Sequence, residues 1–211
     1  MSKIGGPARA KPRKTAKQAR SAETIRVILE AAARILERQG HAGFTTNAVA
    51  EHAGVSIGSL YQYFPGKDAL IGALIVQETS ALVAEATTGS QQPTGRGAIQ
   101  SFIAAAVAHQ LRRPALARLL DFEESKLPFD PDTQRVAGEL RSIIVDALGR
   151  PDLQPQSEPA VAAADVFAIV KGMVDAAGER GNQESQALRE RVSWAVFGYL
   201  DAGKPPVDQP R

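Results

Sequence analysis

The sequence predicts an all-α protein. Apolar residues recur at spacings of three and four through most of the 211 residues, which is the period of a helix buried along one side. Aromatic residues make up only 5% of the chain, whereas alanine and leucine are plentiful, and this composition favours helices over sheet. Prolines fall in nearly every gap between the periodic segments, where they end one helix or begin the next. The length is enough for one small module and one larger domain.

Charge is unevenly distributed along the chain. The formal net charge is only +2, yet residues 1–22 hold seven lysines and arginines and no acid, so they contribute +7 and the remainder carries −5. The same stretch is rich in glycine, proline and alanine, and such a composition cannot bury enough apolar surface to order itself. We therefore expect residues 1–21 to form a flexible basic arm and the proline-rich residues 203–211 to form a flexible tail.

Three helices are expected in the domain formed by residues 22–66. Gly40 supplies a left-handed stop to the first of them, and the hydroxyl pair Thr45 and Thr46 can cap the second. A Pro-Gly break at 65–66 ends the third. The expected helices run from about residue 22 to 39, from 47 to 53 and from 56 to 63.

The remaining residues, 67–202, are expected to form a larger helical domain. Its first helix is long and apolar and is followed by a polar loop over residues 87–94. The periodic segments predict helices at 67–86, 96–112, 114–125, 131–148, 158–179 and 184–201.

Composition disfavours several classes of function. The chain contains no cysteine, which excludes disulfides, thiolate metal sites and a cysteine nucleophile. Its histidines are scattered, and the sequence has no serine elbow, phosphate loop or paired metal-ligand spacing. No apolar run approaches the roughly 18 residues that span a bilayer, and no apolar signal segment follows the basic N-terminus. We expect a cytoplasmic protein with no catalytic activity, metal or cofactor, and a helical enzyme is the alternative.

Residues 46–63 have the features of a helix-turn-helix. Two short helices that cross steeply need a small residue where they touch, a glycine in the turn and apolar side chains at the corner. Ala50, Gly54 and Leu60 meet these three needs, and Val49 and Val55 fill the remaining corner. Glycine adopts positive φ without the steric cost that other residues incur. A corner inside an ordinary helical domain is the alternative interpretation.

The second short helix has a surface suited to a DNA groove, because it is polar and aromatic rather than amphipathic. Ser59 and Gln62 can read base edges, and Gly58 lets the backbone approach closely. Side chains suited to phosphate oxygens are Thr46, Ser56, Tyr61, Tyr63 and Lys67.

The run from Phe44 to Lys67 resembles the signature of the tetracycline-repressor (TetR) family, whose glycine, aromatic and lysine positions it shares. The resemblance extends over residues 24–74. It implies an all-helical homodimer in which three N-terminal helices bind DNA and the later helices enclose a ligand pocket and form the dimer interface. The DNA-facing positions that it implies are Thr46, Ser56, Gly58, Ser59, Tyr61, Gln62, Tyr63 and Lys67.

Two positions depart from the family pattern. Gly66 stands where the family commonly has a polar N-cap, although glycine caps only modestly less well than serine. Asp68 still places a carboxylate at the start of the next helix, where it is favourable. Ile57 stands where family members often have a polar or basic side chain, so the base contacts should differ at this position.

The middle helices combine many apolar residues with few polar ones, which favours a largely apolar ligand pocket. Charged residues of this region, including Asp121 and Glu124, could orient a ligand, or they could simply form a solvated helix face. The candidate pocket residues are Phe102, Val107, His109, Leu120, Phe122, Glu123 and Phe167.

The last two expected helices supply a candidate dimer interface. Residues 160–178 alternate alanine and glycine with larger apolar side chains, which permits close helix approach, and the last helix carries further large apolar residues. An internal hairpin core is the alternative. The interface candidates are Val166, Val170, Met173, Val174, Trp194 and Phe197.

These features predict a sequence-specific transcriptional regulator, most simply a repressor that a small molecule releases from a palindromic operator. Ligand entering between the middle helices would shift the helix that starts at Lys67 and change the separation of the two recognition helices. The basic arm would contact the minor groove or the phosphates. An activator and a non-specific architectural DNA-binding protein are the alternatives.

Overall fold

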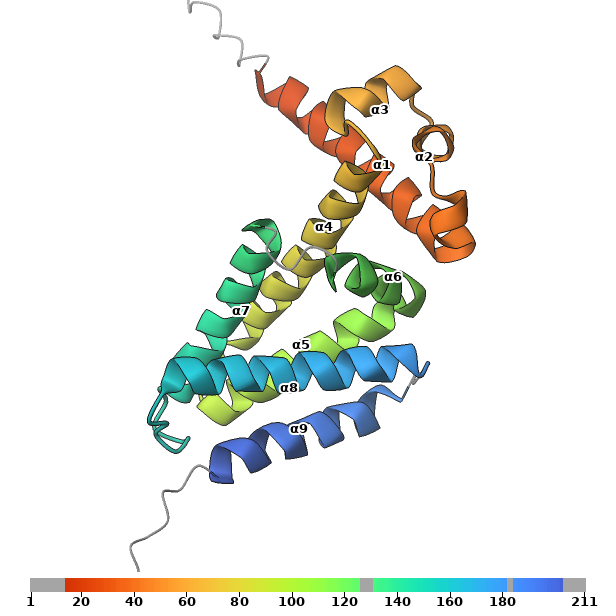
Figure 1. Ribbon diagram of the computed structural model, residues 1–211. Coiled ribbons are helices and arrows are strands. Elements are labelled where there is room, and N and C mark those ends of the chain that lie inside the picture. The colour runs from red at the N-terminus through yellow and green to blue at the C-terminus, as the bar shows by residue number, and fades with distance from the viewer. Residues whose placement is uncertain (1–13, 126–130, 182–183, 203–211) are drawn as a thin grey trace, which may run out of the picture. The chain divides into compact units, whose positions relative to one another are not determined.

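The computed structural model describes residues 14–125, 131–181 and 184–202, which form helices joined by turns and short loops (Figure 1). No strand occurs within these ranges, and the predicted all-α fold is confirmed. The helices are α1 (Lys14–Gly43), α2 (Thr46–Ala53), α3 (Ile57–Tyr63), α4 (Lys67–Gly89), α5 (Gly95–Arg112), α6 (Pro114–Ser125), α7 (Pro131–Leu148), α8 (Pro159–Glu179) and α9 (Ser185–Ala202).

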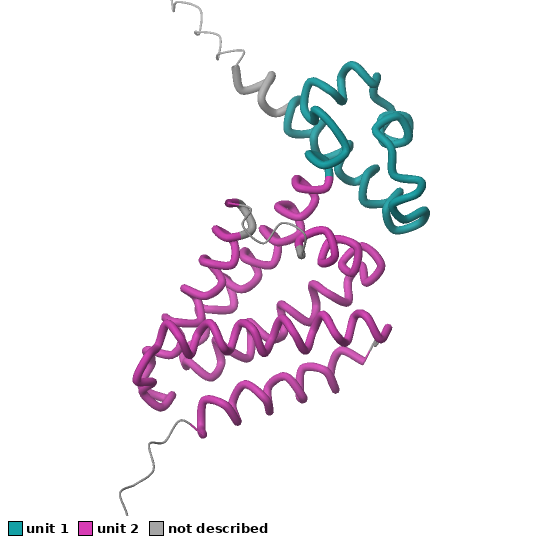
Figure 2. Tube along the Cα trace, in the orientation of Figure 1, with its two compact units in different colours: residues 1–70 teal, residues 71–211 magenta. Residues whose placement is uncertain are grey.

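The chain divides into two compact units (Figure 2). The first, residues 1–70, contains α1, α2, α3 and the first turn of α4, and the second, residues 71–211, contains the other helices. The division falls between Leu70 and Ile71, which is inside α4 rather than at its start. One continuous helix therefore belongs to both units.

Helix α1 begins before its apolar stripe. It starts at Lys14, so the prediction of a flexible arm up to residue 21 is wrong for residues 14–21. The rest of the predicted arm, residues 1–13, lies outside the described residues, as does the predicted tail at 203–211. The early start follows from composition, because no proline or glycine separates Pro12 from Gly40 and this stretch is rich in good helix formers. Gly40 has a φ of 60° and kinks the helix one turn before its end.

The remaining helix limits agree with the predicted ones within a few residues. The largest difference is at α4, which continues to Gly89 and shortens the polar loop expected at 87–94. The hydroxyls of Thr87 and Thr88 donate to backbone carbonyl oxygens one turn back, at 2.8 and 3.0 Å. Because these hydroxyls are bonded within the helix, they do not compete for nearby backbone groups in a way that would favour a loop.

A single apolar core fills the second unit. Helix α5 packs against α7, α8 and α9, and α8 packs against α6, α7 and α9. Helices α5 and α8 are therefore the inner helices of this unit and position the residues that face its interior. Large side chains in this core include Ile99, Phe102, Ile103, Ile144, Val166, Leu188, Val192 and Val196.

The loop after α7 holds the start of α5. The Asp152 carboxylate accepts hydrogen bonds from the backbone N–H groups of Gly95 and Arg96 at 2.7 and 2.9 Å. Arg150 donates to the backbone carbonyl oxygens of Ser90 and Thr94, at 2.6 and 3.1 Å. The N–H groups of Arg96 and Gly95 hold the pKa of Asp152 below its ordinary value, because they stabilise the ionised carboxylate.

Replacing Asp152 with alanine should lower the thermal midpoint by a few degrees at neutral pH, because two N–H groups at the start of α5 lose their acceptor. The pKa of Asp152 is lower in the folded state, so its stabilisation is complete above the ordinary pKa and is lost as pH falls through the folded value. The difference in midpoint between wild type and variant should therefore shrink on acidification below about pH 4. Calorimetry across pH tests this, and a difference that is constant with pH would contradict it.

Helix α4 is long and apolar enough to cross a membrane, judged by length and composition alone. Its most apolar 18-residue window has a mean hydropathy of 1.4 and is 28% buried, and no other helix in the described ranges meets the same criterion. The prediction that no apolar run approaches this length is wrong for α4. Its apolar residues include Leu74, which is fully buried, and Ile75, which lies beside Glu78 and Thr79 in the wall of a pocket.

Candidate functional site

The corner between α2 and α3 has the predicted construction. Val49, Ala50 and Leu60 are at most 3% exposed, and Val55 is half-buried. Gly54 ends α2 with φ 66° and ψ 28°, and its N–H donates to carbonyl oxygens of the preceding turn. A Cβ added at Gly54 would meet no atom within 4 Å. Glycine is therefore suited to this turn by its backbone conformation rather than by lack of space.

Helices α2 and α3 are both capped by side chains. Thr45, rather than the pair Thr45 and Thr46, caps α2, because its hydroxyl accepts the N–H of Ala48 at 3.1 Å. Ser56 caps α3 by accepting the N–H of Ser59 at 3.0 Å, and the two serine hydroxyls lie 2.8 Å apart. The hydroxyls of Ser56 and Ser59 thus already have a structural role at the start of α3.

The polar face of α3 is open to solvent. Tyr61 is 49% exposed and Ile57 is 38% exposed. The other predicted DNA-facing residues fall into two groups by exposure: Ser56, Gly58, Gln62 and Lys67 are exposed, and Thr46, Ser59 and Tyr63 are half-buried. All eight predicted positions belong to the first unit.

Two contacts connect this face to its neighbours. The hydroxyl of Thr46, at the start of α2, lies 3.2 Å from the hydroxyl of Tyr61 on α3. The ammonium of Lys67 lies 5.9 Å from the ring centroid of the buried Phe44. Hydroxyl, amide and ammonium groups are the side chains that contact phosphate oxygens and base edges in DNA. The paired hydroxyls of Thr46 and Tyr61 can approach one phosphate together.

The second unit contains a cavity of about 550 Å³, which is within the usual size range of small-molecule sites. Residues of α4, α5, α6, α7 and α8 line it. Its apolar wall includes Leu82, Phe102, Ala106, Phe122, Val136, Leu140, Phe167, Val170 and Val174. Its polar residues are Thr79, His109, Gln110, Arg118, Asp121, Glu124, Lys171, Asp175 and Glu179.

A network of charges lies at the polar end of the cavity. The Lys171 ammonium is 3.1 Å from Asp175, 3.3 Å from Glu124 and 4.0 Å from Asp121. Gln110, which is 3% exposed, donates from Nε2 to Asp121 at 3.1 Å. Burial alone would lower the pKa of Lys171, but the three carboxylates outweigh burial and raise it. Burial raises the pKa values of Asp121 and Asp175, and Lys171 opposes both shifts.

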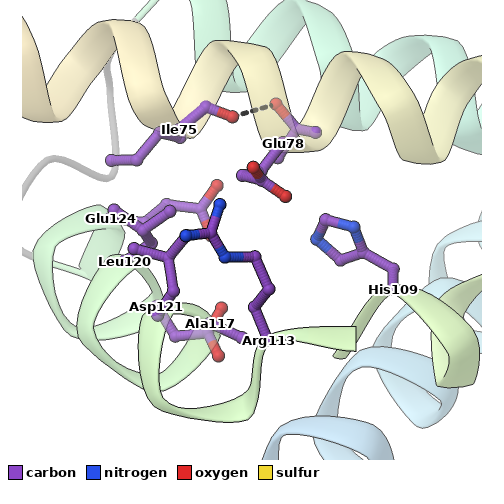
Figure 3. Close-up of a pocket in the computed structure, with 10 residues that line it drawn as sticks. Ile75, Glu78, His109, Arg113, Ala117, Leu120, Asp121 and Glu124 are labelled. Carbon is purple, nitrogen blue, oxygen red and sulfur yellow. Dashed lines mark hydrogen bonds between the residues drawn. The ribbon is translucent and has the colours of Figure 1, made fainter. Parts of the chain in front are cut away.

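A smaller pocket adjoins these residues (Figure 3). Glu78 of α4, His109 of α5 and Arg113 lie around it together with residues of α6. Burial lowers the pKa of His109, and its buried Nδ1 atom has no hydrogen-bond partner among the residues that the structure describes. His109 is therefore neutral near pH 7 and lines both this pocket and the larger cavity.

The structure brings together five of the seven predicted pocket residues. Phe102, His109, Phe122 and Phe167 line the larger cavity, and Leu120 lines the smaller pocket. The other two candidates line neither. Val107 is 1% exposed and lies in the apolar core, and Glu123 is absent from both linings.

Sequence reasoning missed apolar residues of the wall, such as Leu82 and Leu140, and most of its polar residues. Gln110, Arg118, Lys171, Asp175 and Glu179 line the cavity but were not candidates. Gln110 carries a detectable signal, because it continues the four-residue spacing of Phe102 and Ala106 along α5. The others come from different helices, and no spacing in the sequence relates them.

Most of the predicted dimer-interface residues are buried inside the protomer. Val166, Val170 and Val174 are at most 3% exposed and belong to the core of the second unit. Phe197 is 7% exposed, and Arg96 stacks on its ring at 4.0 Å. The three valine assignments are corrected, because the face that carries these residues already packs within one chain. The assignment of Phe197 stays a prediction, because Phe197 also lines an open hollow beside Trp194. Met173 is half-buried, and Trp194 is 71% exposed.

Comparisons with known proteins match both units. Residues 28–74 match the model of bacterial regulatory proteins of the tetR family, and residues 96–200 match the tetracyclin repressor-like C-terminal domain. The chain is 26% identical over 155 residues to the nucleoid occlusion factor SlmA of Marinomonas sp. (strain MWYL1), covering 70% of this chain and 79% of that protein.

Solved structures agree with this match. A TetR-family transcriptional regulator from Streptomyces coelicolor is 25% identical, with a TM-score of 0.68 over 86% of this chain and 98% of that one. A TetR transcription regulator from Haloarcula marismortui ATCC 43049 shares the fold at 16% identity, with a TM-score of 0.71 over 86% of this chain and 98% of that one. The chain therefore belongs to the TetR family of DNA-binding transcriptional regulators.

Proposed function

We propose that this regulator is a cytoplasmic repressor that binds a palindromic operator as a homodimer and is released by a small molecule. The observation that carries the proposal is the presence in one chain of two features. The first feature is the exposed polar helix α3, which is the second helix of a helix-turn-helix. The second feature is a cavity of about 550 Å³ whose wall includes residues of α4. Because α4 belongs to both units, a ligand that shifts α4 would alter the DNA-binding unit. The family consists of regulators rather than enzymes.

We assign two roles to the DNA-facing residues. Tyr61, with the Thr46 hydroxyl 3.2 Å away, and Lys67 contact phosphates, which fixes the register of the protein on any duplex. Gln62 and Ile57 are exposed on α3 and read base edges. Ser56 and Ser59 contribute chiefly by capping α3, and Gly58 allows close approach of the backbone. Tyr63 is half-buried and supports the phosphate contacts.

The proposed dimer uses the outer faces of α8 and α9, not the inner ones that the sequence suggests. Val161 on α8 is 51% exposed, and Trp194 on α9 is 71% exposed. Ala168 and Gly172 are exposed small residues on α8 that would permit close approach of a second copy. A Cβ added at Gly172 would meet no atom within 4 Å of its own chain. A two-fold axis through this surface would present two copies of α3 to two half-sites.

Selection of bound fragments from genomic DNA, followed by footprinting, tests the proposal. We expect a two-fold symmetric protected site with half-sites about one helical turn apart, and affinity at least about 10³-fold higher than for random DNA. Sedimentation of the free protein should give a dimer. Equal affinity for operator and random DNA would instead identify an architectural binder. The position of the site relative to its promoter separates repression from activation.

The basic arm should add affinity without sequence preference. Removing residues 2–13, which include four lysines and arginines, should weaken operator binding and reduce the slope of log K against log salt by about 0.9 for each phosphate that the arm neutralises. Binding isotherms at several salt concentrations measure both effects. A full-length control with those four cations changed to glutamine should behave like the deletion. Unchanged affinity and slope would assign the arm no role in DNA binding.

A further inference from the structure

The cavity of about 550 Å³ in the second unit has three phenylalanines in its wall. Phe102 of α5, Phe122 of α6 and Phe167 of α8 all line it. Aromatic ring faces attract cations when the positive charge lies within about 6 Å of the ring centroid, and the attraction is greater where water is excluded. The wall can therefore hold either a neutral apolar body or an apolar body that carries a positive charge.

Among the described residues that line this cavity, acidic side chains outnumber basic ones. Asp121, Glu124, Asp175 and Glu179 line it, against Lys171 and Arg118. His109 adds no charge, because burial lowers its pKa. These six acidic and basic side chains carry a formal charge of −2 when all are ionised.

The cations of the cavity are poorly placed to receive an anion. Lys171 already lies within 4.0 Å of Asp121, Glu124 and Asp175, so an anionic ligand would have to compete with three carboxylates for it. Arg118 is exposed. Gln110 directs its amide N–H to Asp121. What the polar end offers a ligand is mainly carboxylate oxygens, which accept hydrogen bonds and attract positive charge.

We propose that the effector of this regulator is an organic cation with a bulky apolar body. The apolar body lies among the phenylalanines, and the positive group lies at the end that carries Asp121 and Glu124. The inference rests on the proposed function, since it names the chemical class of the effector. It adds a positive group to the apolar body that a largely apolar pocket suggests. A cation bound here would compensate the net negative charge of the side chains that line the cavity.

Calorimetric titration of the full chain, without DNA, tests the preference. The probes are tetraphenylphosphonium and tetraphenylborate, which carry four phenyl groups and opposite charges, and triphenylphosphine oxide, which carries three phenyl groups and no charge. We expect the phosphonium ion to bind at least about tenfold more tightly than the oxide, the order of effect that uncompensated carboxylates produce. Equal binding of phosphonium and oxide, or phosphonium binding weaker than the oxide, would overturn the proposal.

Charge-changing variants separate electrostatic attraction from general damage to the site. Glu124→Gln and Asp121→Asn should each weaken phosphonium binding several-fold and leave oxide binding within about twofold, whereas Lys171→Gln should strengthen phosphonium binding. Asp146→Asn is the matched control, since Asp146 is exposed on α7 and does not line the cavity. Equal weakening of both probes in the acid variants, or weaker phosphonium binding in Lys171→Gln, would overturn the proposal. Borate binding that is unchanged by these variants and tighter than phosphonium binding would assign the cavity to anions.

These outcomes are independent of the DNA experiments. A failed cation preference leaves operator binding and release by another effector intact. Failure to find an operator leaves the titrations interpretable, because they contain no DNA.

Discussion

The Leu60→Ala variant should lose its folded helix-turn-helix, with the free energy of unfolding of the first unit falling by about 2–5 kcal/mol. Leu60 is 0% exposed and is the buried residue of α3. Removing its side chain leaves a cavity at the corner with α2, in a unit too small to have much stability to spare. Operator binding should disappear together with the fold of this unit.

Hydrogen exchange measured by mass spectrometry can localise this effect. Peptides covering residues 44–64 should exchange faster in Leu60→Ala, and peptides of the second unit serve as an internal reference. Leu60→Met is the matched control, since a volume-conserving swap costs less than about 1.5 kcal/mol. Wild-type protection of residues 44–64 in the alanine variant would show that α3 is not held by the packing of Leu60.

Gln62→Ala should change which operators are bound rather than how tightly DNA is bound in general. The exposed amide of Gln62 can pair with the edge of an adenine, and such a contact discriminates by about 1–3 kcal/mol, or about 5- to 150-fold, at one base pair of each half-site. Binding to a library that holds every single substitution of the operator measures this. A uniform decrease across the library would remove Gln62 from base recognition.

Tyr61→Phe is the natural comparison, because it deletes one hydroxyl from the adjacent position. That hydroxyl lies 3.2 Å from Thr46 and is assigned to a phosphate, so its removal should weaken binding to all sequences by a similar factor. If Tyr61→Phe altered the preference at single base pairs, the two assignments would have to be exchanged.

The helix-turn-helix could be predicted almost residue by residue because its determinants are local. The positive φ of Gly54 and the cap that Thr45 provides to Ala48 involve residues close together in the chain. The buried Leu60 follows from the period of a helix only seven residues long. Such features leave a direct mark on the sequence.

The roles of the residues on α8 could not be predicted in the same way. Periodicity shows that Val166, Val170 and Val174 share an apolar face, but it does not show what covers that face. In the structure the cover comes from the same chain, through α5, α7 and α9. The hairpin-core alternative is therefore the correct one for these three valines.

The polar end of the cavity was beyond prediction for a similar reason. Gln110, Asp121 and Lys171 come from three helices, and each is a common residue on a helix surface. Only the fold brings them within hydrogen-bonding and ion-pairing distance. The prediction for the start of α1 was wrong for a different reason. The composition of residues 1–21 suggested a flexible arm, and the helix propensity of residues 14–21 was given too little weight.

The exposure of Trp194 has a spectroscopic consequence. It is the only tryptophan in the sequence, it is 71% exposed, and it is not among the residues that line the large cavity. The intrinsic tryptophan fluorescence of the protein therefore arises from one indole on the outer face of α9. A blue shift of this emission would show that the indole has become covered, so fluorescence can follow self-association through this face. The emission should respond little to a ligand in the cavity of about 550 Å³, because Trp194 does not line it.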